Sequence, residues 1–465
     1  MKRYVNIKDE FVKHKSALLT KGSFLQNFSF SFTGNTFIII SQFVFAPILS
    51  RIYSPDAYGI FSVFNAIASN LVLIGTMRLE GAIVLEKNER EFDQLMNVLY
   101  CLALSVTLFT CIVTFFLKNQ ILAWFNIGSL GNWLYSLGPF VLLGILLQIT
   151  GNLTIKKKAF KEAVLYNSPT VVGSKVFNVV YGYLSKGALN GFILSETLLR
   201  FFAVFLRYKY ILKSRFKGMR AWKAVDFKHI FKKYKQFPLY DLPNNWLGLF
   251  SLQIPIFILS SFGTSTIGLL GFAASLLEMP MRLLGYSIQP VFLQKVSEVY
   301  YNNPEDLKRI TLELFKKLLL LGVVPFSILM VFGSEIFQIV FGNKWTLAGT
   351  FTSYLSFFYL FRLISEPMDC ILIVHQKQRV LFIFQLVLLA LRCIVLFVGV
   401  LFNSATISIL SYGIVSGLCY LILNIIILNK AGVKVSEALK YSVPVIFVPV
   451  IILFLIKIFV LSIAR

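Results

Sequence analysis

The sequence predicts an all-α membrane protein whose chain crosses the bilayer many times. Of the 465 residues, 57% are hydrophobic and 14% are charged, whereas a soluble chain carries about 25% charged residues. The mean hydropathy is +0.76. Apolar windows of about 20 residues, the length that crosses the hydrocarbon core, recur along the whole chain. We therefore expect no separate soluble domain.

The apolar windows form two sets of six helices and one further helix. The first set lies near residues 24–50, 60–85, 95–117, 135–155, 166–186 and 188–208. The second lies near 238–262, 265–293, 311–333, 348–374, 380–402 and 405–429, and the last window is 441–461. We expect an N-lobe (1–212), a basic cytoplasmic linker (213–236), a C-lobe (237–430) and a C-terminal helix (431–465).

Lys and Arg are distributed unequally between the two sides of these spans. The polar, basic N-terminus precedes an apolar segment without a small-residue cleavage site, which indicates a retained helix. With a cytoplasmic N-terminus, the outer segments keep only Arg51, Lys118, Lys186, Lys344 and Arg465. The positive-inside rule predicts this orientation, and it explains the net charge of +24 without nucleic acid.

Weak internal similarity indicates a duplicated bundle. Residues 49–59 and 259–268 both follow a proline and join the first two helices of a half. Two outer segments, 119–133 and 334–345, hold equivalent places, and we expect interfacial helices there with Trp124, Trp133 and Trp345 at headgroup level. Six helices per half place both halves in the same orientation. This predicts a pseudo-two-fold along the membrane normal and a central cavity.

The sequence offers no catalytic or metal-binding constellation. The five cysteines lie singly in apolar runs, and the three histidines lie in polar segments between spans. A Walker lysine motif is missing as well. We expect neither an enzyme nor a cofactor or metal.

Basic side chains nevertheless lie inside the predicted spans. They are Arg78, Lys175, Arg200, Arg282, Arg362, Arg392 and Lys457. Each costs roughly 2.5–3.5 kcal/mol at a bilayer centre, so it needs an anion, a carboxylate or a water-filled cavity. All but Lys457 are candidates for binding an anionic substrate, and Lys457 lies near the outer end of its helix, where it can snorkel.

Local ion pairs are the alternative explanation for some of these charges. Spacings of four join Glu196 to Arg200, Glu278 to Arg282 and Arg362 to Glu366. Glu80 follows Arg78 by two residues, about 200° around a helix, so the two should face different neighbours. Lys175 and Arg392 have no carboxylate within a turn of their own helices.

Acidic residues in the spans are candidates for coupling transport to H⁺ or Na⁺. They are Glu80, Asp241, Glu278, Glu366 and Asp369. Asp241 stands between Pro238 and Pro243, where interrupted helical bonding frees carbonyls for a cation. The alternative is that Asp241 only begins a helix near the cytoplasmic interface.

Four segments give the chain a family resemblance over nearly its whole length. They are residues 52–61 (IYSPDAYGIF), 78–85 (RLEGAIVL), 237–243 (FPLYDLP) and 341–345 (FGNKW). In this order and these topological places, they resemble the polysaccharide and O-antigen flippases of the superfamily that also holds multidrug extruders and lipid II flippases. One departure is that residues 24–50 offer only Asn27, Asn35 and Gln42 where drug extruders carry an acidic residue.

The resemblance implies two six-helix lobes around a cavity in the bacterial inner membrane. It implies transfer of an undecaprenyl-diphosphate-linked oligosaccharide from the cytoplasmic to the periplasmic leaflet, for surface polysaccharide or lipopolysaccharide. The buried cations would then be counter-charges for the diphosphate. We expect a monomer in contact with membrane lipid and with polymerase or ligase machinery. The alternatives are an ion-coupled exporter of amphiphilic drugs and a non-transporting scaffold.

Overall fold

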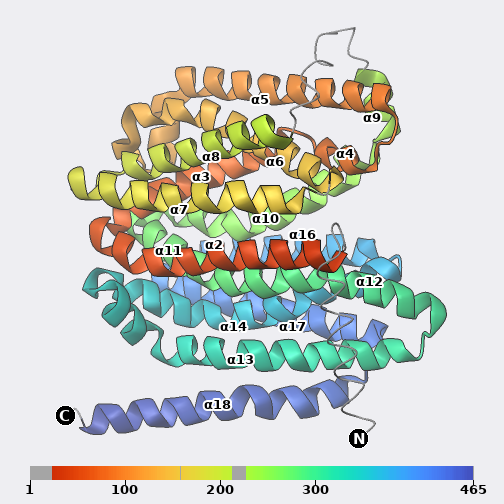
Figure 1. The fold of residues 1–465 in the computed structure, drawn as a ribbon. Helices are drawn as coiled ribbons and strands as arrows, with labels where there is room; N and C mark the ends of the chain where they lie inside the picture. Colours follow the sequence, from red (N-terminus) through yellow and green to blue (C-terminus); the bar gives the residue numbers. More distant parts are fainter. Residues whose placement is uncertain (1–23, 158, 212–226, 464–465) are drawn as a thin grey trace, which may run out of the picture.

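A computed structural model describes residues 24–157, 159–211 and 227–463, and every element within these ranges is a helix (Figure 1). The all-α prediction is confirmed. The long helices are α2 (Phe24–Ile52), α3 (Pro55–Ile74), α5 (Glu89–Trp124), α6 (Leu137–Lys156), α7 (Phe160–Leu184), α8 (Asn190–Ile211), α10 (Leu242–Ile258), α11 (Thr264–Pro280), α12 (Tyr286–Asn302), α13 (Asp306–Phe341), α14 (Thr346–Met368), α16 (Gln378–Leu401), α17 (Ala405–Lys430) and α18 (Val435–Ile463).

Shorter elements join them. They are η1 (Leu79–Gly81), α4 (Ala82–Leu85), η2 (Gly128–Ser136), α9 (Phe227–Lys233), η4 (Phe237–Asp241), η5 (Leu259–Phe262), η6 (Met281–Gly285), η7 (Asn343–Trp345) and α15 (Cys370–Val374). Of these, η4 and η6 have π-helical geometry. Each predicted apolar window thus contains a helix, although part of the predicted linker, 213–226, lies outside the described residues.

Nine helical segments within the described ranges are long and apolar enough to cross a membrane. They include α18, whose apolar stretch is Val435–Val460. The predicted windows in α2, α7, α8 and α14 do not reach this length and apolarity. In α2 only Thr36–Ile52 qualifies as apolar, while α7, α8 and α14 carry the charges described below.

The helices pack into two bundles (Figure 1), and each bundle has its own hydrophobic core. In the first bundle, the N-lobe, α6 packs against α3, α5 and α8, while α7 packs against α2 and α8. In the second, the C-lobe, α14 packs against α11, α13 and α17, and α16 packs against α10 and α17. Helix α18 lies along α13 at the edge of the molecule.

The two lobes meet most closely where α3 crosses α11. A methyl group at Gly59 would lie 1.8 Å from the Thr264 carbonyl oxygen, and one at Gly268 would lie 1.8 Å from the Pro55 carbonyl oxygen. Only glycine permits this approach of the two backbones. We call it the glycine contact. The Asp56 carboxylate accepts a hydrogen bond of 2.6 Å from Thr264 beside it.

The start of α3 follows directly from the sequence. Ser54 has extended backbone and its hydroxyl accepts from the Ala57 N–H at 3.3 Å. Pro55 occupies the first turn, where its missing N–H has no cost, and Asp56 adds negative charge at the positive end of the helix. The motif that carries the resemblance at 52–61 is therefore a helix-starting sequence that places Gly59 against α11.

An aromatic cluster closes the same end of the interface. Tyr58 lies 5.3 Å from the Phe272 ring and 5.1 Å from the Trp345 ring. Trp345 is fully buried and donates its indole N–H to the Ser50 carbonyl at 2.8 Å. The prediction of Trp345 at headgroup level was wrong, because η7 folds its ring between the lobes. Trp124 is 68% exposed, as a headgroup position requires.

Equivalent kinks occur in the third helix of each lobe. Leu117 in α5 (φ −105°, ψ 15°) and Phe332 in α13 (φ −113°, ψ 15°) leave helical geometry. The predicted outer segments begin at these kinks. They start as continuations of the long helices and end in η2 and η7, so they are not separate interfacial helices. The matching kinks support the predicted duplication.

Candidate functional site

The group around Arg78 begins where α3 loses its regular geometry. Arg78 has left-handed backbone (φ 62°, ψ 7°) and precedes the 3₁₀ segment η1. Its Nε lies 2.8 Å from Asp241 Oδ2, and its Nη1 lies 3.2 Å from Glu80 Oε1. The expectation that Arg78 and Glu80 face different neighbours was wrong, because it assumed a continuous α-helix through both residues.

Asp241 brings the C-lobe to this group. It ends the π segment η4, and Asn245 donates to its Oδ1 at 2.9 Å. Its side chain forms no capping bond at the start of α10, so the helix-start explanation lacks its usual hydrogen bond. Glu80 is 1% exposed, whereas the side chains of Arg78 and Asp241 are 30% and 40% exposed. The ion pair of Arg78 and Asp241 joins the two lobes and is partly exposed at the molecular surface, so a ligand can reach it.

Arg282 lies at the corresponding break in the C-lobe. Helix α11 ends at Pro280, and Arg282 belongs to the π segment η6, which contacts α2 of the N-lobe. Its side chain is exposed. No carboxylate of the described residues lies within ion-pair distance of it. The predicted pair with Glu278 was wrong, because the change from α to π geometry at Met281 removes the face shared by residues four apart.

Glu278 pairs instead with Arg362 inside the C-lobe. The Arg362 guanidinium, 3% exposed, contacts Glu278 Oε1 through Nη1 and lies 2.7 Å from Glu366 Oε1 through Nε. The predicted pair of Arg362 and Glu366 is confirmed. Asp369 follows one turn later, and one oxygen each of Glu366 and Asp369 is buried without a hydrogen-bond partner among the described residues. Two carboxylates thus share one guanidinium.

Lys175 and Arg200 have partners that their own helices could not reveal. Lys175 Nζ on α7 lies 3.3 Å from Glu196 Oε1 on α8. The predicted ion pair of Glu196 with Arg200 is not formed. Arg200 turns the other way, toward α6, where its Nη1 donates to the Phe140 carbonyl at 3.3 Å and its guanidinium lies 3.7 Å from the Phe140 ring centre.

A seven-residue repeat explains the position of Arg200. Seven residues later, Arg207 Nη1 donates to the Leu147 carbonyl at 3.1 Å, and Leu147 lies seven residues after Phe140. Gly144 and Gly151, four residues after each carbonyl, leave the α6 backbone open to the guanidinium groups. Arg207 was overlooked as part of the basic run before the linker, although its spacing from Arg200 was a usable signal.

Arg392 is enclosed within the C-lobe and is 0% exposed. Its Nη1 donates to the Ser251 carbonyl at 3.0 Å and to the Ser251 hydroxyl at 2.7 Å, and its Nε donates to the Ser416 hydroxyl at 2.9 Å. In a regular helix the Ser251 carbonyl would accept from residue 255, which is proline and has no N–H. Arg392 therefore supplies the hydrogen bond that Pro255 removes from α10.

Lys457 also bonds to a helix other than its own. Its Nζ lies 2.6 Å from Glu335 Oε1 and 2.6 Å from the Val331 carbonyl oxygen, beside the kink at Phe332. These contacts join α18 to α13 and agree with the structural role expected for Lys457.

A polar cluster outside the spans was not foreseen. Glu86 accepts from Lys233 Nζ at 2.5 Å and from the Tyr234 hydroxyl, and Lys233 also pairs with Glu91. Burial raises the pKa of Glu86, but the hydrogen bonds from Lys233 and Tyr234 outweigh it and lower the pKa to about 2. The cluster fixes the end of the basic linker against α4 and α5 through long-range contacts.

The candidate residues therefore form three separate ionic groups: Arg78 with Glu80 and Asp241, Lys175 with Glu196, and Arg362 with Glu278 and Glu366. Arg282 lies outside these groups, in the segment η6 that contacts α2 of the N-lobe. The described part of the chain has no cluster of three His, Cys, Asp or Glu residues that could hold a metal ion.

Comparison with known proteins decides the family. The sequence model of a family described as "Polysaccharide biosynthesis protein" matches residues 48–350, which include both arginine breaks. The chain belongs to this family. A curated relative, an uncharacterized membrane protein in the cps region of Klebsiella pneumoniae, is 22% identical over 375 residues, covering 79% of this chain and 74% of the relative. This polysaccharide biosynthesis protein is therefore a multi-pass membrane protein.

Solved structures share the fold of this family member. The lipid II flippase MurJ in an inward closed conformation matches with a TM-score of 0.68 and 17% identity, covering 94% of this chain and 99% of MurJ. An inward-facing multidrug resistance transporter of the MATE family in the MOP superfamily matches with a TM-score of 0.62 and 14% identity, covering 90% and 98%. At these identities the likeness concerns the fold.

Proposed function

We propose that this protein is a flippase that moves an undecaprenyl-diphosphate-linked oligosaccharide from the cytoplasmic to the periplasmic leaflet of the bacterial inner membrane. Membership of the polysaccharide biosynthesis family supports the sugar part of the proposal. The fold shared with a lipid II flippase supports transfer between leaflets. The two lobes would alternate between openings on either side of the membrane, and the product would pass to a polymerase or ligase.

One observation carries the proposal: the second helix of each lobe breaks beside an arginine at the lobe interface. Arg78 follows α3, and its segment η1 contacts η4. Arg282 follows α11, and its segment η6 contacts α2. A guanidinium binds phosphate with paired hydrogen bonds, so one arginine from each lobe suits a diphosphate.

Lys175 is the third proposed phosphate ligand. Its side chain is 19% exposed and its single carboxylate partner lies at 3.3 Å, a contact that a phosphate can replace. Arg200, Arg362 and Arg392 were equal candidates from sequence. Their contacts with backbone carbonyls, glutamates and serines support a structural role, and we leave them out of the proposed phosphate site.

We propose H⁺ as the coupling ion, exchanged at the Arg362 group. Glu278 and Glu366 together carry one more negative charge than Arg362 can neutralise, and Asp369 adds another beside them. Buried carboxylates in excess of cations are stabilised by protonation. Glu80 and Asp241 form the second candidate pair, because release of Arg78 to a diphosphate would leave both free to bind a proton.

The test uses purified full-length protein in proteoliposomes and a radiolabelled undecaprenyl-diphosphate disaccharide, with a lectin that reports only the outer leaflet. Arg78→Ala and Arg282→Ala should each slow transfer roughly tenfold or more, the effect of losing a charged hydrogen bond. Arg309→Ala, which removes a 72% exposed arginine, is the matched control and should transfer normally.

Two outcomes would contradict the proposal. Normal transfer by both interface variants would remove the arginines from the phosphate site. Absence of transfer by the wild type, together with export of a cationic dye from the same vesicles, would favour the amphiphile exporter instead.

A further inference from the structure

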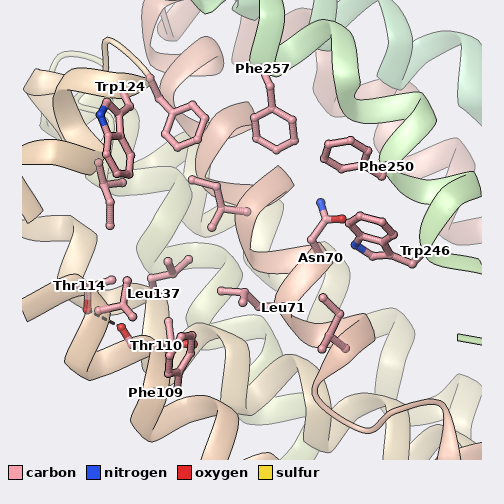
Figure 2. Close-up of a pocket in the computed structure, with 15 residues that line it drawn as sticks. Asn70, Leu71, Phe109, Thr110, Thr114, Trp124, Leu137, Trp246, Phe250 and Phe257 are labelled. Atoms are coloured by element: carbon pink, nitrogen blue, oxygen red, sulfur yellow. Dashed lines mark hydrogen bonds between the residues drawn. The ribbon is translucent and has the colours of Figure 1, made fainter. Parts of the chain in front are cut away.

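An apolar pocket of about 500 Å³, whose lining includes no charged residue, lies between the two lobes (Figure 2). Helices α3 and α5 of the N-lobe line one side and α10 of the C-lobe lines the other. Its volume is in the range of small-molecule sites, about 300–1,000 Å³. Aromatic side chains from both lobes dominate the lining, among them Trp124, Phe125, Trp246, Phe250 and Phe257.

The pocket is reached from the lipid-facing surface. Two lining residues of α5, Phe109 and Trp124, are 62% and 68% exposed. Phe109 lies far from both ends of a 36-residue helix that qualifies as a membrane span, so its exposed face meets hydrocarbon. An occupant that enters here comes from the bilayer and is itself apolar.

Two lining residues with polar groups, Asn70 and Trp246, lie together at one end of the pocket. Asn70 donates its amide N–H to Gln253 at 2.5 Å, but its Oδ1 is buried without a hydrogen-bond partner in the described part of the chain. The same holds for the Trp246 indole Nε1. Figure 2 shows Asn70 beside Trp246, on the side away from Trp124. Both atoms are buried, so the lining that an occupant meets is apolar.

Of the α10 residues that line the pocket, Trp246 lies nearest in the chain to the Arg78 group. Trp246 follows Asp241 by five residues, which is roughly 7.5 Å along a helix. Asp241 is the residue that holds Arg78 at 2.8 Å. A ligand could therefore place an anionic head at Arg78 and its apolar chain in the pocket, because the two sites follow one another along α10.

We infer that the pocket binds the isoprenoid chain of the lipid-linked substrate, in the part next to the diphosphate. This inference rests on the proposed function and adds to it a site for the lipid. The occupant is an isoprenoid diphosphate and not a bulk phospholipid, because the pocket and the Asp241 partner of Arg78 follow one another along α10, and a guanidinium binds a diphosphate with paired hydrogen bonds. Binding across α5 and α10 would also make occupancy depend on the arrangement of the lobes.

The experiment is photo-crosslinking of the wild-type chain in vesicles of phosphatidylethanolamine and phosphatidylglycerol. The probe is geranylgeranyl diphosphate with a diazirine on the isoprene unit nearest the phosphates. Adducts should map to residues 246–257 and 109–125 and disappear with excess unlabelled geranylgeranyl diphosphate. A phosphatidylglycerol probe with a diazirine in its acyl chain provides the second arm, and it should label these residues no more than other lipid-facing helices.

A matched pair of variants adds a quantitative measure. Val113→Trp fills the pocket, whereas Val398→Trp places the same side chain on an exposed face of α16. Val113→Trp should lower probe labelling roughly tenfold, the effect of about two methylene groups losing their burial, and Val398→Trp should match the wild type. Size-exclusion profiles check that both variants fold. The crosslinking sites in the wild type test the inference even if a variant does not fold.

The outcomes separate the inference from the proposed function. Adducts elsewhere, or equal labelling of the pocket by phosphatidylglycerol that the diphosphate does not displace, overturn the inference. If the wild type still transfers the lipid-linked disaccharide in that case, the proposed function stands. Absence of both displaceable labelling and transfer overturns both.

Discussion

The two ends of the lobe interface are built in different ways. At the glycine contact, α3 and α11 touch backbone to backbone, with the Tyr58, Phe272 and Trp345 rings packed beside them. At the other end, Arg78 reaches Asp241 through a partly exposed ion pair. Close packing tolerates no added atom, whereas an exposed ion pair contributes little to stability and can exchange partners. Contact between the lobes therefore depends on close packing at the first end and on charge at the second.

The largest effect is expected from Gly59→Ala. Its methyl group would lie 1.8 Å from the Thr264 carbonyl oxygen, so the lobes must separate at this end. We expect a loss of roughly 1–3 kcal/mol in the free energy of unfolding and little transfer activity. Thermal denaturation in detergent and the proteoliposome assay measure the two effects.

Gly173→Ala is the control for that substitution. A methyl group at this α7 position would meet no atom within 4 Å, so helix propensity should leave stability unchanged or raise it. Equal behaviour of the two alanine variants would mean that the glycine contact does not limit the approach of the lobes.

The second prediction concerns the bond that Arg392 supplies to α10. Arg392→Met leaves the Ser251 carbonyl without a donor and should cost roughly 1–3 kcal/mol. In a Pro255→Ala background the alanine N–H can take over, so the cost should fall by about 1 kcal/mol. Thermal denaturation of the wild type, the two single variants and the double variant gives the coupling free energy between Arg392 and Pro255.

A Pro325→Ala background provides the matched control, because Pro325 lies in α13, where the carbonyl four residues earlier belongs to Leu321. The effects of Arg392→Met and Pro325→Ala should add. A coupling with Pro325 as large as that with Pro255 would refute the explanation of Arg392.

The third prediction tests the ionic end by exchange of charges. Arg78→Asp and Asp241→Arg should each abolish transfer. Asp241→Arg should change the free energy of unfolding by less than about 1 kcal/mol, because its ion pair is partly exposed. Arg78→Asp should cost roughly 1–3 kcal/mol, because it also leaves the buried Glu80 carboxylate unpaired. The double variant restores the ion pair with reversed positions. If Arg78 binds the diphosphate, the double variant should be more thermally stable than Arg78→Asp but should not transfer. Recovered transfer would assign Arg78 to closure of the interface alone.

The smallest effect on stability is expected from Glu86→Gln, which tests whether charge also holds the basic linker in place. Its pKa is lowered from 4.5 to about 2 in the folded protein. The stabilisation is therefore complete above pH 4.5 and is lost as the pH falls toward 2. The difference in melting temperature between the wild type and Glu86→Gln should be constant from pH 7 to about 5 and shrink below 4.5.

Glu298→Gln is the control for Glu86, since its carboxylate is 60% exposed and lies 3.8 Å from Lys295. It should show no such dependence. A constant difference between the wild type and Glu86→Gln down to pH 3 would contradict the lowered pKa.

The fold was predictable because apolar length and charge asymmetry are properties of the chain itself. The site was predictable only where the helix stays regular. Arg362 and Glu366 pair as expected within α14, while left-handed backbone at Arg78 and π geometry at Arg282 overturn the spacing arguments. The partners of Lys175 and Arg392 lie on other helices, and no spacing rule contains that information.

The bond between Arg392 and the Ser251 carbonyl has a mechanical consequence for α10. It attaches the middle of this helix to α16, so α10 must travel with the C-lobe. Asp241 lies ten residues before Ser251, roughly 15 Å nearer the start of the same rod. A rotation of the C-lobe would therefore carry Asp241 with it and change the distance between its carboxylate and Arg78.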